Sequence, residues 1–284
     1  MGIGQDLRMQ YRTGDLTTKL IFFNIAVFVL SIVLFYKFRA AAFDYPTWIA
    51  LSSDPLTVAT RPWTLLIYSF FHGGFFHLLF NLIILNFAGR LFLTFFNERQ
   101  MLGLYLTSAI FAGLCYMGGY YLLGRESIIV GASGAIMAIL MGAATYAPNM
   151  DIRLLLIGRI KLWHFAAAVI LIDLLYILAE NTGGHIAHLA GAFFGYIYVE
   201  QVKRGRDLGS WLASAFGWAA GLAPKTKKTP FRKVHRTTKA PAVKPSGKNV
   251  QQKRIDEILD KISKSGYDSL SAEEKEFLFR AGKE

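Results

Sequence analysis

The sequence predicts an all-α polytopic membrane protein built as a bundle of six transmembrane helices. Apolar residues make up 54% of its 284 residues, and they fall in long blocks instead of the periodic stripes of a soluble domain. Crossing about 30 Å of hydrocarbon takes about 20 mainly apolar residues. Six blocks reach or approach this length, at 20–36, 75–96, 101–123, 128–147, 162–179 and 185–202. The single cysteine excludes a disulfide framework.

The first block, 20–36, has two possible interpretations. It could be a cleaved signal peptide, because Ala40–Ala42 resembles a cleavage site. However, Lys37 and Arg39 intervene, and the apolar stretch is longer than a usual signal core, so we expect an uncleaved first span. The connector that follows, 37–74, mixes prolines with tryptophans, which predicts a partly structured loop lying in the membrane interface.

Positively charged residues predict the orientation of the bundle. The net charge of +12 is unevenly spread, since 225–248 carries nine Lys or Arg and no Asp or Glu. Cytoplasmic segments of membrane proteins are enriched in Lys and Arg. Both termini should therefore be cytoplasmic, and spans two, four and six should run from outside to inside. Short loops favour the inner membrane of a bacterium.

The chain after the sixth span divides into three predicted parts. As a seventh span, 204–223 would export the basic tail, so we expect an interfacial helix there. A disordered basic linker, 224–249, should contact anionic lipid. In 250–284, Ser271 with Glu274 forms a capping box, which predicts a small cytoplasmic helical hairpin. Its apolar stripe comprises Ile255, Ile258, Leu259 and Ile262. The remaining domains are a cytoplasmic segment, 1–19, and the six-span domain, 20–203.

Polar side chains recur near the amino-terminal ends of spans two, four and six. They are His77, Asn81, Ser133 and His188. Because these three spans run in the same direction, the four side chains should share one depth just below the outer surface. Polar groups at this depth are costly unless they pair or line a wet cavity. The pattern therefore predicts a site.

Acyl transfer is the chemistry that such a set could support. A serine hydroxyl is a poor nucleophile until a base removes its proton, and a neutral His188 at a helix amino terminus suits this task. His77 and Asn81 are four residues apart on one helix face and can both donate hydrogen bonds to an oxyanion. Gly131 and Gly134 let the backbone approach a substrate.

These residues resemble those of the rhomboid family of intramembrane serine proteases. Three motifs carry the resemblance: "HGGFFHLLFN" (His72–Asn81), "GASG" (Gly131–Gly134) and "AHLAGAFFG" (Ala187–Gly195). The resemblance implies a rhomboid-like bundle that cleaves single-span membrane proteins through an acyl-enzyme. It implies a dyad of Ser133 as nucleophile and His188 as general base, without a third acid.

The resemblance also implies the supporting residues of the site. His77, Asn81 and the amide of Ser133 would stabilise the oxyanion. Gly191 and Gly195 would let span six pack tightly on span four. Two positions depart from the family pattern: Trp63 is followed by threonine where many members have arginine, and Met137 replaces an aromatic residue four positions after the nucleophile.

Other polar residues leave alternatives open. His185 and His188 could ligate a metal, but with no Cys or acid expected near them and no HExxH motif we expect no metal and no cofactor. His72 either supports the first outer loop or has no role. Asp173 should lie near mid-depth, away from the dyad, in a structural hydrogen bond, with a proton relay as its alternative.

Two other functional classes compete with the protease. One is a catalytically inactive rhomboid-like protein that binds membrane helices, and the other is a small transporter or proton channel, which lacks a visible inverted repeat. No nucleic-acid partner is expected, and the oligomeric state is open. The presence of all four polar site residues favours the protease.

Overall fold

The computed structural model describes residues 2–154, 157–177, 181–219 and 247–281 of the chain. It divides into two units, 1–224 and 225–284, which are described separately. The first unit contains helices α1 (Ile3–Thr13), α2 (Leu16–Phe35), α3 (Pro55–Thr60), α4 (Thr64–Ile67), α5 (Phe75–Leu93), α6 (Glu98–Leu123), α7 (Ser133–Tyr146), α8 (Leu162–Tyr176), α9 (Thr182–Lys203) and α10 (Ser210–Ala219).

The only strands among the described residues are short antiparallel pairs at the ends of helices. They are β1 (Tyr36–Lys37) with β2 (Ala42–Phe43), β3 (Leu51–Ser52) with β4 (Ile128–Ile129), and β5 (Asp151–Leu154) with β6 (Gly158–Lys161). The predicted all-α fold class is confirmed. A 3₁₀ turn, η1 (Tyr68–Phe70), precedes α5, so the long connector is partly structured as the sequence predicts.

Local sequence explains where the helices begin and end. Asp15 caps α2 by accepting from the Thr18 N–H at 2.9 Å. Asn97 and Gln100 form a capping box at the start of α6, which begins three residues before the predicted block 101–123. Gly124, with φ of 61°, ends α6 in the left-handed conformation that glycine favours.

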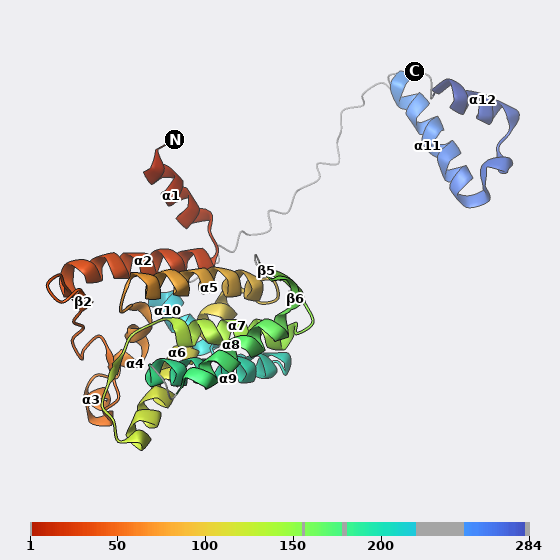
Figure 1. The fold of residues 1–284 in the computed structure, drawn as a ribbon. Helices are drawn as coiled ribbons and strands as arrows, with labels where there is room; N and C mark the ends of the chain where they lie inside the picture. The colour runs from red at the N-terminus through yellow and green to blue at the C-terminus, as the bar shows by residue number, and fades with distance from the viewer. Residues whose placement is uncertain (1, 155–156, 178–180, 220–246, 282–284) are drawn as a thin grey trace. The chain divides into compact units, whose positions relative to one another are not determined.

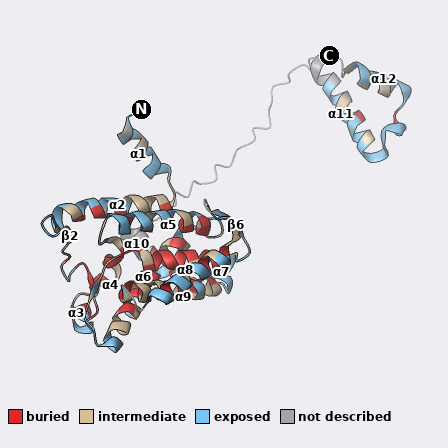
Figure 2. Ribbon diagram, in the orientation of Figure 1, coloured by how far each residue is buried: buried red, intermediate tan, exposed pale blue. Residues whose placement is uncertain are grey.

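The bundle is arranged around α7 (Figure 1). Ten of its fourteen residues are buried, and the buried residues gather in the interior of the bundle (Figure 2). Such a helix, apolar on all sides, belongs to the core of a bundle. In contrast, α8 buries only Leu162, Ala166 and Asp173, as an outer helix does.

Three of the described helices are long and apolar enough to cross a membrane: α2, α5 and α6. The apolar helices α7 and α8 are shorter. At 1.5 Å per residue, the 14 residues of α7 extend roughly 21 Å. The molecule is a membrane protein with an all-α fold, and the count of six spans stays a prediction.

α10 lies in the segment predicted as an interfacial helix. It packs against α6 through a close glycine contact, in which a Cβ on Gly103 would lie 2.8 Å from the Gly209 carbonyl oxygen. Arg99 adds a hydrogen bond to the Ser214 hydroxyl at 2.5 Å. The predicted basic linker, 224–249, lies outside the described residues apart from its last three.

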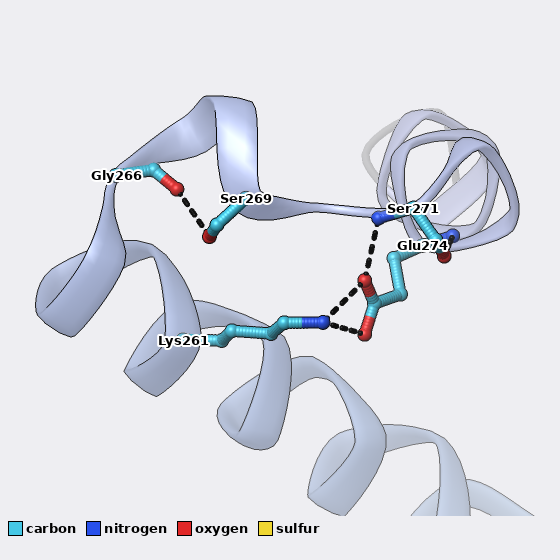
Figure 3. A network of polar contacts seen from close by, with 5 residues as sticks. All are labelled: Lys261, Gly266, Ser269, Ser271 and Glu274. Atoms are coloured by element: carbon cyan, nitrogen blue, oxygen red, sulfur yellow. Dashed lines mark hydrogen bonds and ion pairs between the residues drawn. The ribbon is translucent and has the colours of Figure 1, made fainter.

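The second unit holds α11 (Gly247–Ser265), the 3₁₀ turn η2 (Tyr267–Ser269) and α12 (Ala272–Ala281). The predicted capping box is confirmed: the Glu274 carboxylate accepts from the Ser271 N–H at 2.8 Å, and the Ser271 hydroxyl accepts from the Glu274 N–H at 3.2 Å. Lys261 of α11 donates to the same carboxylate at 2.9 Å (Figure 3). Of the predicted stripe, Ile258 is buried whereas Leu259 is half exposed.

Removing the cap should loosen α12 selectively. The Ser271→Ala variant loses a cap hydrogen bond worth about 1 kcal/mol, so amides in the first turn should exchange about five-fold faster. Hydrogen exchange read by mass spectrometry on the full chain measures this effect. Ser269→Ala is the matched control, because the Ser269 hydroxyl donates to the Gly266 carbonyl outside α12. Equal exchange in both variants would contradict the capping role.

Candidate active site

Ser133 is the first residue of α7, at the end of a loop that is anchored to the first connector. In the β3–β4 pair, Leu51 lies opposite Ile129. The Gly131 N–H then donates to the Tyr68 carbonyl at 3.0 Å. The predicted block 128–147 is thus helical only from Ser133 onward. Since the first N–H groups of a helix have no partner within it, the Ser133 amide is free to serve a ligand.

Gly131 leaves room for the His77 ring beside Ser133. Its φ of 143° lies in the region that favours glycine. A Cβ at this position would lie 3.0 Å from Nε2 of His77 and 3.6 Å from Oγ of Ser133. The bare backbone therefore brings the imidazole and the hydroxyl, 56 positions apart in the sequence, to one point.

The hydrogen bond on the other side of His77 sets its tautomer. Nδ1 of His77 accepts from the Gly73 N–H at 3.4 Å. An accepting Nδ1 assigns the proton of the neutral ring to Nε2. Nε2 is the atom beside Gly131, so the ring presents a donor next to Ser133.

Asn81 presents a second donor, one helical turn after His77. The side chain is 7% exposed and lines the same cavity as Ser133. Within the described part of the chain, its Nδ2 is buried without a hydrogen-bond partner. An unpaired buried amide costs free energy, about 1–3 kcal/mol, unless a bound group accepts from it. Asn81 is therefore placed to bind an oxygen atom beside the serine.

Glycines bring α9 against α7 at the level of the site. A Cβ on Gly191 would lie 1.9 Å from the Gly134 carbonyl oxygen, and one on Gly195 would lie 2.2 Å from that of Ala138. The fit at Gly134 is less tight, since a Cβ there would lie 3.1 Å from the Ala187 carbonyl oxygen. The predicted tight packing of span six on span four is confirmed, and it places His188 in the cavity with Ser133.

Asp173 of α8 is the residue that sequence reasoning placed wrongly. Its Oδ1 atom lies 2.6 Å from Nδ1 of His185 and 2.9 Å from Nδ1 of His188. The prediction that Asp173 is hydrogen-bonded is confirmed, but the expectation that it lies away from the dyad is wrong. Asp173 lies in the last turn of α8, which ends at Tyr176, and so reaches the amino-terminal turns of α9.

Asp173, His185 and His188 could also hold a metal ion. Their ligand atoms all lie within 4.8 Å of one another, a spacing that suits a divalent cation. The prediction of no metal site assumed no acid near the two histidines, and this premise is wrong. The observed hydrogen bonds give the carboxylate another use, which is to accept from both rings.

A cavity of about 330 Å³ connects these groups between α5, α7, α8 and α9. Asn81, Ser133, Asp173, His185 and His188 supply its polar atoms. Its remaining walls are apolar and consist of Phe80, Ile84, Ile136, Met137, Leu140, Phe165, Val169 and Ile172. The cavity can therefore accept an apolar side chain while the polar groups act on a backbone carbonyl.

His72 lies behind His77, just before α5. It is fully buried, and the two rings meet edge to face with centroids 5.2 Å apart. Its backbone carbonyl accepts from the Tyr45 hydroxyl at 2.9 Å. Burial lowers the pKa of the His72 imidazole from 6.5 to about 3, and the neighbouring His77 adds to this effect. The ring is therefore neutral in the folded protein, where it supports His77.

This burial predicts an acid-sensitive fold. Below pH 6.5 the unfolded state binds a proton that folded His72 rejects, so stability falls as the pH falls, by about 1.4 kcal/mol per unit. From pH 7 to pH 5 the loss is about 2 kcal/mol. The His72→Phe variant should lose this part of the pH dependence of Tm in detergent. His164→Phe, at an exposed histidine, is the control, and an unchanged slope in His72→Phe would contradict the assignment.

Comparison with known proteins gives matches on both units. A family model described as "Rhomboid domain" matches residues 59–204, and one described as "Family of unknown function (DUF6576)" matches residues 246–283. The mitochondrial presenilin-associated rhomboid-like protein of Homo sapiens is 28% identical over 180 residues, covering 61% of this chain and 46% of that protein. Its A form in Danio rerio is 26% identical over 151 residues, covering 52% and 39%. The chain thus spans less than half the length of these relatives.

The family match extends over more than half of the chain. It includes α5, α7, α8 and α9, the helices that line the cavity. Asn81, Ser133 and His188, one from each motif, lie on three of these helices. The chain belongs to the rhomboid family.

Proposed function

We propose that the protein is an intramembrane serine endopeptidase. The observation that carries the proposal is the convergence of Ser133, Asn81 and His188 on one cavity with apolar walls. A nucleophile, a base and an oxyanion donor within one cavity are the groups that hydrolysis of a peptide bond needs. The names of the relatives identify them only as rhomboid-like, so the activity rests on this geometry.

The proposed reaction begins at the Ser133 hydroxyl. His188 takes its proton while Oγ attacks the scissile carbonyl carbon, and the carbonyl oxygen becomes an oxyanion. The amide of Ser133, Nδ2 of Asn81 and Nε2–H of His77 are the donors that stabilise this oxygen. His188 then protonates the departing amine, which leaves an acyl-enzyme, and water attacks it in a second round that frees Ser133.

The substrate class follows from the walls of the cavity. We propose that substrates are single-span membrane proteins, because the apolar cavity lies within the helix bundle. A helical carbonyl is hydrogen-bonded and shielded, so the substrate helix must unwind locally at the cleaved bond. Small residues at that bond and helix-breaking residues beyond it are therefore expected.

Orientation and membrane belong to the same proposal. We infer from the distribution of Lys and Arg that both termini lie on the cytoplasmic side. From the short loops we infer the inner membrane of a bacterium, with the serine near its outer surface. Fusing a reporter to each end and to the loop at residues 124–127 tests this topology. If a reporter that functions only in the cytoplasm is active when fused at this loop, the topology is contradicted.

Reconstitution tests the activity itself. Purified protein in liposomes with a generic single-span substrate should cut it at one bond, which intact mass identifies, and Ser133→Ala should not. Labelling by a serine-directed fluorophosphonate gives a readout that does not depend on the substrate. If the parent neither cleaves the substrate nor is labelled, the proposal is contradicted. That result would favour a protein that binds membrane helices without cutting them.

A further inference from the structure

Asp173 is a buried acid with two histidine partners. It is 4% exposed, and a buried carboxylate is stable only with hydrogen-bond donors that offset its lost hydration. One oxygen, Oδ1, lies 2.6 Å from Nδ1 of His185 and 2.9 Å from Nδ1 of His188. Both distances are short enough for charge-assisted hydrogen bonds.

These contacts determine which nitrogen of His188 can act as a base. An ionised carboxylate only accepts, so Nδ1 of His188 is the donor and carries the ring proton. The other nitrogen, Nε2, then has the free lone pair. This is the tautomer that a general base for Ser133 requires.

We propose that Asp173 is a positioning residue that acts through His188. Resting on the proposed protease function, this role makes a triad of Ser133, His188 and Asp173. Asp173 holds the ring of His188 in one tautomer and orientation and stabilises the imidazolium that forms when Ser133 loses its proton. His185 donates to the same oxygen and helps to keep the carboxylate ionised between turnovers.

The groups around His188 give the proposal a kinetic signature. The groups that face this ring are Asp173 from α8, His185 on its own helix and His77 from α5. Asp173 is the acid among them, so it is the group that stabilises the imidazolium as it forms. Its loss should therefore lower kcat, while KM should stay near that of the parent.

The experiment measures kcat and KM in liposomes with a single-span substrate. Asp173→Asn should lower kcat by about 10²–10⁴-fold, as loss of the acid does in other serine protease triads, and should leave KM within a few-fold of the parent. Asp173→Glu should recover at least about ten-fold of the loss, because it restores the charge. Asp151→Asn, a loss of charge at the exposed ion pair with Lys161, is the matched control.

The outcomes distinguish failure of the triad from failure of the proposed function. If Asp173→Asn loses activity only in proportion to its loss of folded protein, and Asp173→Glu recovers none of it, Asp173 has a structural role and the inference is overturned. Full activity of Asp173→Asn would overturn it as well. Failure of the proposed function looks different, since the parent itself would then neither cleave nor accept the fluorophosphonate.

Discussion

Ser133→Ala and His188→Ala should each abolish cleavage of a membrane substrate, by roughly 10⁶-fold in kcat, and the double variant should be no slower than either. The reason is that a hydroxyl without its base, or a base without its hydroxyl, does no covalent chemistry. A sensitive fluorogenic substrate in liposomes provides the range that this comparison needs. Fluorophosphonate labelling should disappear in both single variants.

A second serine provides the control for this result. Ser108 of α6 is buried, but its hydroxyl donates to the Tyr105 carbonyl at 3.1 Å and does not line the cavity. Ser108→Ala should therefore keep activity near that of the parent. If Ser133→Ala cleaves at the parental rate, Ser133 is not the nucleophile, regardless of the results for the other variants.

Asn81→Leu should lower kcat by about 10²–10³-fold while leaving KM within a few-fold of the parent. The Asn81 amide is a buried donor next to Ser133, and its partner forms only when the carbonyl oxygen becomes an oxyanion. Leucine keeps the volume of the side chain and removes the donor. Steady-state kinetics in liposomes separate kcat from KM.

Asn86 on the same helix is the matched control for Asn81. Its side chain is exposed and accepts from Nε of Arg90 at 2.9 Å. Asn86→Leu should therefore leave kcat unchanged within about two-fold. A rise in KM at constant kcat in Asn81→Leu would show uniform binding of the substrate instead of oxyanion stabilisation.

The convergence of Ser133, Asn81 and His188 on one cavity could be predicted from the directions in which their helices run. Helices that run in the same direction through one membrane bring residues near their amino termini to one depth, so counting along the chain was enough. The chemical types of these residues then indicated acyl transfer as the reaction. The roles of these residues stay predictions until the variants are measured.

Asp173 shows where such counting fails. With a predicted block of 162–179, Asp173 falls near mid-depth, but α8 ends at Tyr176 and its last turn lies level with the start of α9. A difference of three residues is about 4.5 Å along a helix, which is enough to decide whether a carboxylate reaches an imidazole. Helix ends are set by local caps and turns, so the length of an apolar block does not predict where its helix ends.

Loop contacts were equally out of reach of the sequence. The pairing of Leu51 with Ile129 joins segments 78 positions apart, and the pattern of two-residue strands is too short to recognise. The sequence also did not reveal that Gly131 adopts a φ of 143° and lies against the His77 ring. Glycines at 131 and 134 indicated a close approach of backbone, but not which ring lies against it.

The glycine contact between α9 and α7 has a mechanical consequence for substrate entry. Where carbonyl oxygen meets Cα, as at Gly191 and Gly134, there are no side chains whose rotation would let the helices part gradually. We therefore expect these two helices to stay together. In the proposed protease, a transmembrane segment would reach Ser133 past the other wall of the cavity, which large side chains such as Phe80 of α5 and Phe165 of α8 line.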